Sequence, residues 1–180
     1  MDLTLAWAAG TKHKIQQKRS EWGWLLTKCE QHNVESVLEI GCFSGGSTFS
    51  FATFAKRLIT IDRINPPKFN ISNITCSYDY VAGNSRDPNT VNRVSDLIGD
   101  DKVDLLFIDG SHSYEGVKSD FELYKKFASK LIGFHDIVDS ASHRRQGCFV
   151  SQFWNEVKLH YPNDEIIERH NWGGIGILEV

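Results

Sequence analysis

The segment EIGCFSGG, from Glu39 to Gly46, decides the fold, because it joins a strand pattern to a helix pattern through a glycine-rich turn. The β-branched run 36–40 leads into the glycines, and residues 47–56 then place apolar side chains on one helical face. Glycines let the backbone pass close to a ligand, and a helix start offers unpaired N–H groups. The segment therefore predicts a buried strand, a ligand-binding turn and a helix.

A second strand pattern, 58–61, ends at Asp62, about 20 residues after the glycine turn, which is where a carboxylate can bind both hydroxyls of a ribose. The glycine spacing differs from the Gly-x-Gly-x-x-Gly of dinucleotide-binding turns, so a nicotinamide-dependent dehydrogenase would share the fold but not this motif. The turn and Asp62 together favour a cofactor site at the end of the first two strands.

Strand patterns and helix patterns alternate along the rest of the chain. Strands are expected at 36–40, 58–61, 74–81, 103–108, 131–134, 165–168 and 175–180, and helices at 12–32, 47–56, 87–99, 117–128 and 150–157. Such alternation predicts an α/β fold with a parallel sheet covered on both faces and ligands bound at the carboxyl ends of the strands. The length of 180 residues suits one domain, 1–180, with a helical segment 1–33 and a catalytic core 34–180.

Composition excludes several classes of partner. The net charge of −3 and the pI near 6.1 argue against binding to nucleic acid or to an anionic membrane surface. No apolar run approaches a membrane span, and the first residues do not resemble a signal peptide. The four cysteines are scattered, without Cys-x-x-Cys pairs or His at zinc-ligand spacing, so we expect reduced thiols in a cytoplasmic protein.

Glu39-x-Gly41-x-x-x-Gly45 resembles the first motif of class I S-adenosylmethionine-dependent methyltransferases. In this family the loop after the third strand lies beside the adenine, and here Gly83-Asn84-Ser85 occupies that place, with Asn84 where an acidic residue is common. The resemblance implies S-adenosylmethionine as cofactor. The residues expected to bind it are Glu39, Gly41, Phe43, Ser44, Gly45, Ser47, Asp62, Arg63, Asn84, Ser85 and Asp109.

The stretch FIDGSHSYE, 107–115, resembles a segment of the methyltransferases that act on sugars of macrolide antibiotics, and GFHD, 133–136, resembles their second acidic motif. The resemblance extends from residue 37 to the C-terminus. It implies a Rossmann-like, doubly wound, mostly parallel sheet of seven strands in the order 3-2-1-4-5-7-6. It also implies O-methylation of a small-molecule hydroxyl, on a sugar or a phenol.

Asp109 and Asp136 end strands that should be neighbours, and two converging carboxylates commonly hold a cation or a proton. By the resemblance, Asp109, His135 and Asp136 are candidate ligands for Mg²⁺ or Mn²⁺, although His135 stands where metal-binding relatives often carry an acidic residue. His112 is the candidate general base, with Asp109 the second catalytic candidate, because an imidazole suits proton removal near neutral pH.

Other functions stay open at this point. A non-catalytic module could keep the glycines and Asp62, and a hydroxylase-like relative could bind iron through His112, His135 and Asp136. The basic run His143–Arg145, in an expected loop 139–147, could pair with a carboxylate or phosphate of the acceptor. The short chain is also compatible with a homo-oligomer whose second subunit completes the acceptor site.

Overall fold

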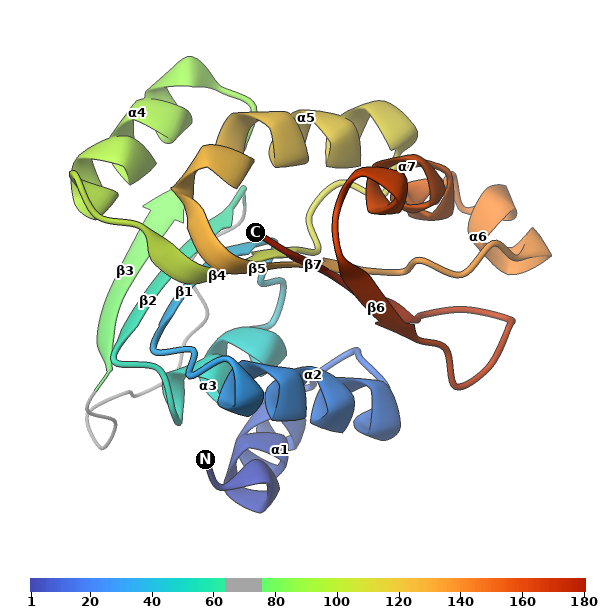
Figure 1. Cartoon of the computed structure of the whole chain (residues 1–180), viewed down its shortest axis with the longest axis horizontal. Coiled ribbons are helices and arrows are strands. Elements are labelled where there is room, and N and C mark those ends of the chain that lie inside the picture. Colours follow the sequence, from blue (N-terminus) through green and yellow to red (C-terminus); the bar gives the residue numbers. More distant parts are fainter. Residues whose placement is uncertain (64–75) are drawn as a thin grey trace.

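The computed structural model describes residues 1–63 and 76–180, and it has a seven-stranded sheet at its centre (Figure 1). The strand order β3-β2-β1-β4-β5-β7-β6 confirms the prediction, with β7 antiparallel to both of its neighbours. The strands are β1 (Ser36–Ile40), β2 (Arg57–Asp62), β3 (Ser77–Ala82), β4 (Val103–Ile108), β5 (Ala128–His135), β6 (Asn163–Ile166) and β7 (Ile175–Glu179). The expected Rossmann-like α/β fold is therefore present.

Helices cover both faces of the sheet (Figure 1). One face carries α1 (Leu3–Lys12), α2 (Arg19–Gln31) and α3 (Gly46–Ala52), and the other carries α4 (Pro88–Ile98), α5 (Tyr114–Tyr124) and α7 (Val150–Val157). The short helix α6 (Ala141–Arg145) and two 3₁₀ turns, Lys125–Phe127 and Lys158–His160, complete the described structure. This arrangement leaves the carboxyl ends of the parallel strands open to a ligand.

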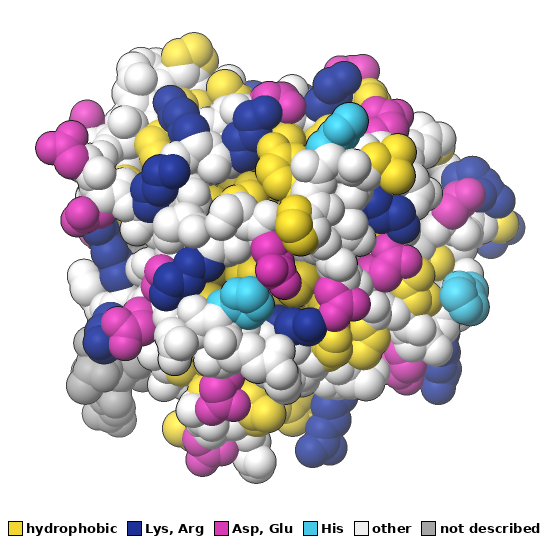
Figure 2. All heavy atoms as spheres, in the orientation of Figure 1, with side chains coloured by type: hydrophobic (Ala, Val, Ile, Leu, Met, Phe, Trp, Pro, Cys, Tyr) yellow, Lys and Arg dark blue, Asp and Glu magenta, His cyan; other side chains and the backbone are white. Residues whose placement is uncertain are grey.

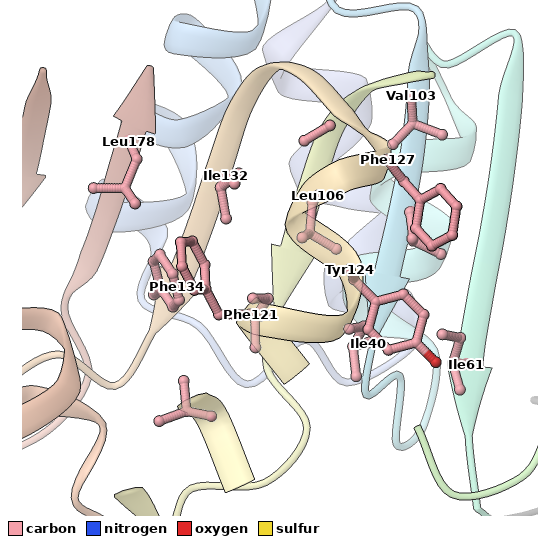
Figure 3. Close-up of a cluster of buried hydrophobic side chains, with 14 of the residues drawn as sticks. Ile40, Ile61, Val103, Leu106, Phe121, Tyr124, Phe127, Ile132, Phe134 and Leu178 are labelled. Carbon is pink, nitrogen blue, oxygen red and sulfur yellow. The ribbon is translucent and has the colours of Figure 1, made fainter. Parts of the chain in front are cut away.

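Each face of the sheet has its own apolar core, because successive side chains of a strand point to opposite faces. In β4, Leu106 packs with the helices α4, α5 and α7, whereas Phe107 packs with Trp22 and Phe51 on the other face. Figure 3 shows the first of these cores, where Phe134 lies beside Phe121. Burying one such side chain contributes roughly 1.5–3 kcal/mol, so both layers help to hold the strands in register.

The helix expected over 12–32 is wrong in its first part. Two helices, α1 and α2, stand there instead, and Lys14 between them has a left-handed backbone with a φ of 61°. The cause is a contact distant in sequence: Ile15 packs so closely on Gly46 that a Cβ added to Gly46 would lie 2.4 Å from the Ile15 backbone. The helical periodicity could not reveal this break, because it depends on a residue of another element.

Smaller differences concern the ends of elements. The helix expected over 117–128 begins at Tyr114 and ends in the 3₁₀ turn, and Ala128 already starts β5. The expected loop 139–147 contains α6, whose N-cap residue Ser140 accepts a hydrogen bond from the His143 N–H. The strand expected over 74–81 begins at Ser77, and residues 74 and 75 lie outside the described part of the chain.

The surface carries charges of both signs. On the face shown in Figure 2, Lys and Arg side chains are interspersed with Asp and Glu side chains, in keeping with the small net charge. Within residues 1–63 and 76–180, none of the helices has the length and apolar character that crossing a membrane requires.

Candidate active site

A cavity of about 810 Å³ lies at the carboxyl ends of β1, β2, β4 and β5. Its walls include most of the residues predicted from the sequence, together with residues of the segment between α1 and α2. The predicted residues that line it are Gly41, Phe43, Ser44, Ser47, Asp62, Arg63, Asn84, Ser85, Asp109, His112, His135 and Asp136. The sheet topology has thus brought residues from five separate segments around one space.

The turn after β1 is fixed by its backbone conformation and by Asp62. Gly41 has a φ of +90°, and a Cβ added there would lie 2.3 Å from the carbonyl oxygen of Asp109. The Asp62 Oδ2 accepts hydrogen bonds from the backbone N–H groups of Cys42 and Phe43, at 2.8 and 2.9 Å. The glycine turn and the carboxylate therefore hold each other in place on the cavity wall.

Glu39 and Gly45 belong to the support of this turn and do not line the cavity. Glu39 is fully buried, and its Oε2 accepts hydrogen bonds from Thr48 and Thr60, at 2.5 and 3.2 Å. Burial raises the pKa of Glu39 to about 7, even though these hydroxyl donors oppose the shift. Gly45, with a φ of +86°, is the N-cap residue of α3. The contact of these two residues with a cofactor therefore stays a prediction.

At the end of β3, a buried carboxylate holds Ser85 in position. The Ser85 hydroxyl donates to Asp120 Oδ1 at 2.6 Å, and the Tyr124 hydroxyl donates to the Ser85 carbonyl at 2.7 Å. Asp120 is fully buried on α5, and burial raises its pKa although the Ser85 bond opposes that shift. We did not predict Asp120; the available signal was its place on the apolar face of the helix, between Val117 and Tyr124.

Two carboxylates and two imidazoles form the polar centre of the cavity. The Asp109 Oδ1 lies 3.2 Å from His135 Nδ1 and 3.4 Å from His112 Nε2. Asp136 approaches the same two nitrogens, with its Oδ1 3.5 Å from His135 Nδ1 and its Oδ2 3.5 Å from His112 Nε2. The four predicted residues are therefore together, as the pairing of β4 with β5 led us to expect.

This grouping shifts the proton affinities of its members. Burial by itself would raise the pKa of Asp109, but the charge of His135 and hydrogen bonds from both imidazoles hold it below the usual range. Burial would lower the pKa of His135, and the attraction of Asp109 reverses this and raises it to about 9. The hydrogen bond to Asp109 raises the pKa of His112, whose side chain is 44% exposed.

Asp109 and Asp136 can hold a cation together with His112, since one ligand atom of each residue lies within 4.8 Å of the others. This set differs from the predicted one, because its third metal ligand is His112 and the predicted third ligand is His135. The Nδ1 atom of His135 faces both carboxylates, and its Nε2 is buried without a hydrogen-bond partner among the described residues. Asp136 adopts a left-handed backbone with a φ of 61°, a conformation found often at functional sites.

Gln17 is a site residue that sequence reasoning missed. Its Nε2 donates a hydrogen bond to Asp109 Oδ2 at 2.6 Å, and only 6% of the residue is exposed. The segment that carries Gln17 also lines the cavity with Lys14, Ile15 and Gln16. No local pattern marks Gln17, because its partner is 92 positions away along the chain.

The basic run 143–145 does not reach the cavity as a whole. His143 lines it, whereas Arg144 pairs with Asp139 on the surface and Arg145 is absent from the cavity wall. The described residues therefore give no arginine of α6 a place against a ligand in this cavity.

The chain resembles known proteins both in sequence and in structure. The model of a family described as a methyltransferase domain matches residues 38–137. An uncharacterised protein of Sinorhizobium fredii, y4gI, is 35% identical over 91 residues, which are 49% of this chain and 9% of that protein. The chain thus spans less than a tenth of this curated relative.

Solved structures share the fold. An O-methyltransferase from Bacillus cereus, in complex with SAH (S-adenosylhomocysteine), superposes with a TM-score of 0.67 and 16% identity, over 99% of this chain and 90% of that one. The MycE methyltransferase of mycinamycin biosynthesis, in complex with Mg, SAH and mycinamycin VI, gives a TM-score of 0.65 and 15% identity. That match covers 99% of this chain and 54% of MycE. At these identities the likeness establishes a common fold.

Proposed function

The chain belongs to the methyltransferase-domain family, and from this premise we propose that it is an S-adenosylmethionine-dependent O-methyltransferase acting on a small-molecule hydroxyl. One observation carries the proposal: a single cavity joins the glycine turn and Asp62 at one end to the Asp109–His112–Asp136 group at the other. In this proposal residues 1–180 form one methyltransferase domain. The helical segment 1–33 covers the end of the cavity that holds the glycine turn and Asp62.

The residues at the first end fit the cofactor. Gly41 lines the cavity and lets the turn after β1 pack against the Asp109 carbonyl, and Asp62 offers a fixed carboxylate for the two ribose hydroxyls. Asn84 and Ser85 line the same cavity, and their polar side chains would hydrogen-bond the edge of an adenine. S-adenosylmethionine, when bound, supplies an electrophilic methyl group on a sulfonium.

His112 is the proposed general base. Its half-exposed ring can meet an acceptor in the cavity, and both carboxylates stabilise the imidazolium that forms after proton removal. Because Nε2 donates to Asp109, the Nδ1 of His112 would take the hydroxyl proton as the oxygen–methyl bond forms and the carbon–sulfur bond of the sulfonium breaks, leaving S-adenosylhomocysteine. Asp109 orients the His112 ring through the contact at 3.4 Å. The other residues of the cavity would contribute mainly by positioning the two reactants.

A divalent cation also fits the donor set. Asp109 and Asp136 would hold Mg²⁺ or Mn²⁺, with His135 or His112 as the third ligand, because carboxylate oxygens suit hard cations and Mn²⁺ accepts an imidazole. Such an ion would lower the pKa of the acceptor hydroxyl. If His112 binds the ion, it cannot also take the proton, so its two roles are alternatives.

Calorimetric titration with S-adenosylmethionine and S-adenosylhomocysteine tests the proposal. We expect micromolar binding to the wild type and at least tenfold weaker binding to Asp62→Asn, about 1.4 kcal/mol. Asp79→Asn, which changes a carboxylate of β3 away from this cavity, is the matched control and should bind as the wild type does. Absence of binding to both ligands would refute the proposal.

A further inference from the structure

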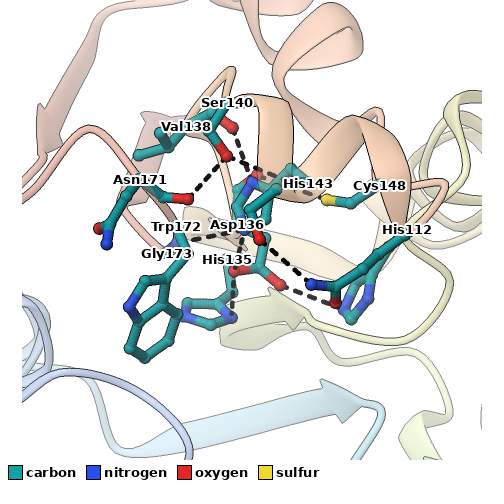
Figure 4. A network of polar contacts seen from close by, with 12 residues as sticks. His112, His135, Asp136, Val138, Ser140, His143, Cys148, Asn171, Trp172 and Gly173 are labelled. Atoms are coloured by element: carbon teal, nitrogen blue, oxygen red, sulfur yellow. Dashed lines mark hydrogen bonds and ion pairs between the residues drawn. The ribbon is translucent and has the colours of Figure 1, made fainter.

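We propose that Asp136, His143 and Cys148 form a second cation site, suited to Zn²⁺. One ligand atom of each residue lies within 4.8 Å of the other two, and all three residues line the cavity. His143 and Cys148 are buried, with 5% and 6% of the residue exposed. Figure 4 shows the three side chains converging beside the polar centre described above.

His143 is oriented as a metal ligand would be. Its Nδ1 lies 2.7 Å from the carbonyl oxygen of Val138, which places the ring proton on Nδ1 and the lone pair on Nε2. A backbone carbonyl that fixes the tautomer in this way is the usual support of a metal-bound histidine.

The Nε2 lone pair then faces another acceptor. Asp136 Oδ1 lies only 3.4 Å from His143 Nε2. The Gly173 N–H also reaches Nε2, at a long 3.3 Å. Zn²⁺ would take the Nε2 lone pair in place of the hydrogen bond from Gly173 and would bind the Asp136 carboxylate as a second ligand.

The donor types select the metal. A nitrogen, a sulfur and a carboxylate oxygen suit Zn²⁺, whereas Mg²⁺ prefers oxygen ligands alone. The cavity can supply water as the fourth ligand. Cys148 Sγ lies 3.9 Å from the Asp136 carbonyl, and binding of Zn²⁺ would replace its thiol proton, which is released to solvent.

Asp136 connects the two candidate sites. Its Oδ1 faces His143 and its Oδ2 faces His112, so both sites use the same carboxylate. We therefore expect Zn²⁺ bound to His143 and Cys148 to weaken the binding of Mg²⁺ on the Asp109 side.

No local sequence motif indicates this site. His143 and Cys148 are five positions apart, and Gly147, with a φ of +73°, turns the chain between them. This spacing matches none of the common zinc motifs, and the third ligand follows β5.

Titration of metal-free protein with Co²⁺, used in place of Zn²⁺, gives a direct test. A sulfur-to-cobalt charge-transfer band in the near ultraviolet should appear in the wild type and be lost in Cys148→Ser. Cys76→Ser is the matched control, because Cys76 lies outside the cavity, and it should keep the band. Calorimetry with Zn²⁺ should show at least tenfold weaker binding to His143→Gln, with circular dichroism confirming that each variant is folded.

The band in the wild type is the decisive measurement, since it requires no variant to fold. Its absence would overturn the proposal, and so would a band that survives Cys148→Ser or Zn²⁺ binding that His143→Gln leaves unchanged. None of these results depends on S-adenosylmethionine. Failure of the zinc site would therefore be distinguishable from failure of the proposed methyltransferase activity, which the Asp62 titration tests separately.

Discussion

Gln17→Leu tests whether the segment between α1 and α2 is part of the active site. The substitution keeps a side chain of similar size but removes the amide that donates to Asp109 Oδ2 at 2.6 Å. Hydrogen bonds to charged groups contribute about 1.5–3 kcal/mol to stability, and the partner here is a carboxylate whose side chain is only 13% exposed. We therefore expect the free energy of unfolding to fall by about 1.5–3 kcal/mol.

Urea denaturation of the wild type and variants measures this difference. For a domain of this size, each 1 kcal/mol lowers Tm by roughly 2–4 °C, so a thermal melt gives a second measurement. Gln16→Leu is the matched control: Gln16 is exposed, and its amide donates to the carbonyl of Lys14. Its free energy of unfolding should change by no more than about 0.5 kcal/mol.

Loss of the Gln17 amide should also loosen the segment between α1 and α2, which forms one wall of the cavity. This segment is tied to the glycine turn as well, because the Ser44 hydroxyl donates to the His13 carbonyl at 3.1 Å. We expect S-adenosylhomocysteine to dissociate faster from Gln17→Leu than from Gln16→Leu in stopped-flow experiments. Equal stability of the two variants, combined with equal dissociation rates, would refute the role assigned to Gln17.

Three further predictions concern single residues. Burial raises the pKa of Glu39 from 4.5 to about 7, so between these pH values the carboxyl group keeps its proton in the folded protein and loses it in the unfolded chain. The free energy of unfolding therefore falls as the pH rises from 4.5 to 7. We therefore compare the free energy of unfolding of Glu39→Gln with that of the wild type by urea denaturation at pH 4 and at pH 8. The difference should shift in favour of the variant by up to about 3 kcal/mol from pH 4 to pH 8. The same difference at both pH values would contradict this. Gly41→Ala should destabilise the protein more than Gly99→Ala in the same assay, since both positions have positive φ but only Gly41 would bring its Cβ onto the Asp109 carbonyl. His112→Gln should reduce methyl transfer by roughly 10²–10⁴-fold while calorimetry shows unchanged S-adenosylhomocysteine binding; near-normal transfer to an acceptor found by a methyl-label screen would exclude it as the base.

The sequence predicted the sheet well, because its signals are local. The apolar runs of β1 and β4 and the residues that follow them are evident from neighbouring positions, and the structure confirms both strands within their predicted bounds. The helix expected over 12–32 failed for the opposite reason. Its break depends on the contact of Ile15 with Gly46, which no local periodicity contains.

The site residues also differ in how far local sequence patterns could predict them. Asp109 and Asp136 could be placed together because each follows a strand and those strands pair in parallel. Gln17 could not be found, since its hydrogen bond joins an irregular segment to a strand end far along the chain. Asp120 was detectable in principle as a carboxylate on an apolar helix face, but its partner Ser85 is known only from the fold.

The arrangement of two carboxyl groups against two imidazoles at the polar centre bears on how a cation would bind there. Asp109 and Asp136 are largely buried carboxyl groups, each with 13% of its side chain exposed, and both face His135 Nδ1. Burial would lower the pKa of His135, but the attraction of Asp109 raises it to about 9, which favours an imidazolium beside the two carboxyl groups. A cation that binds between Asp109 and Asp136 would compete with the proton of His135 Nδ1 for the same carboxyl groups.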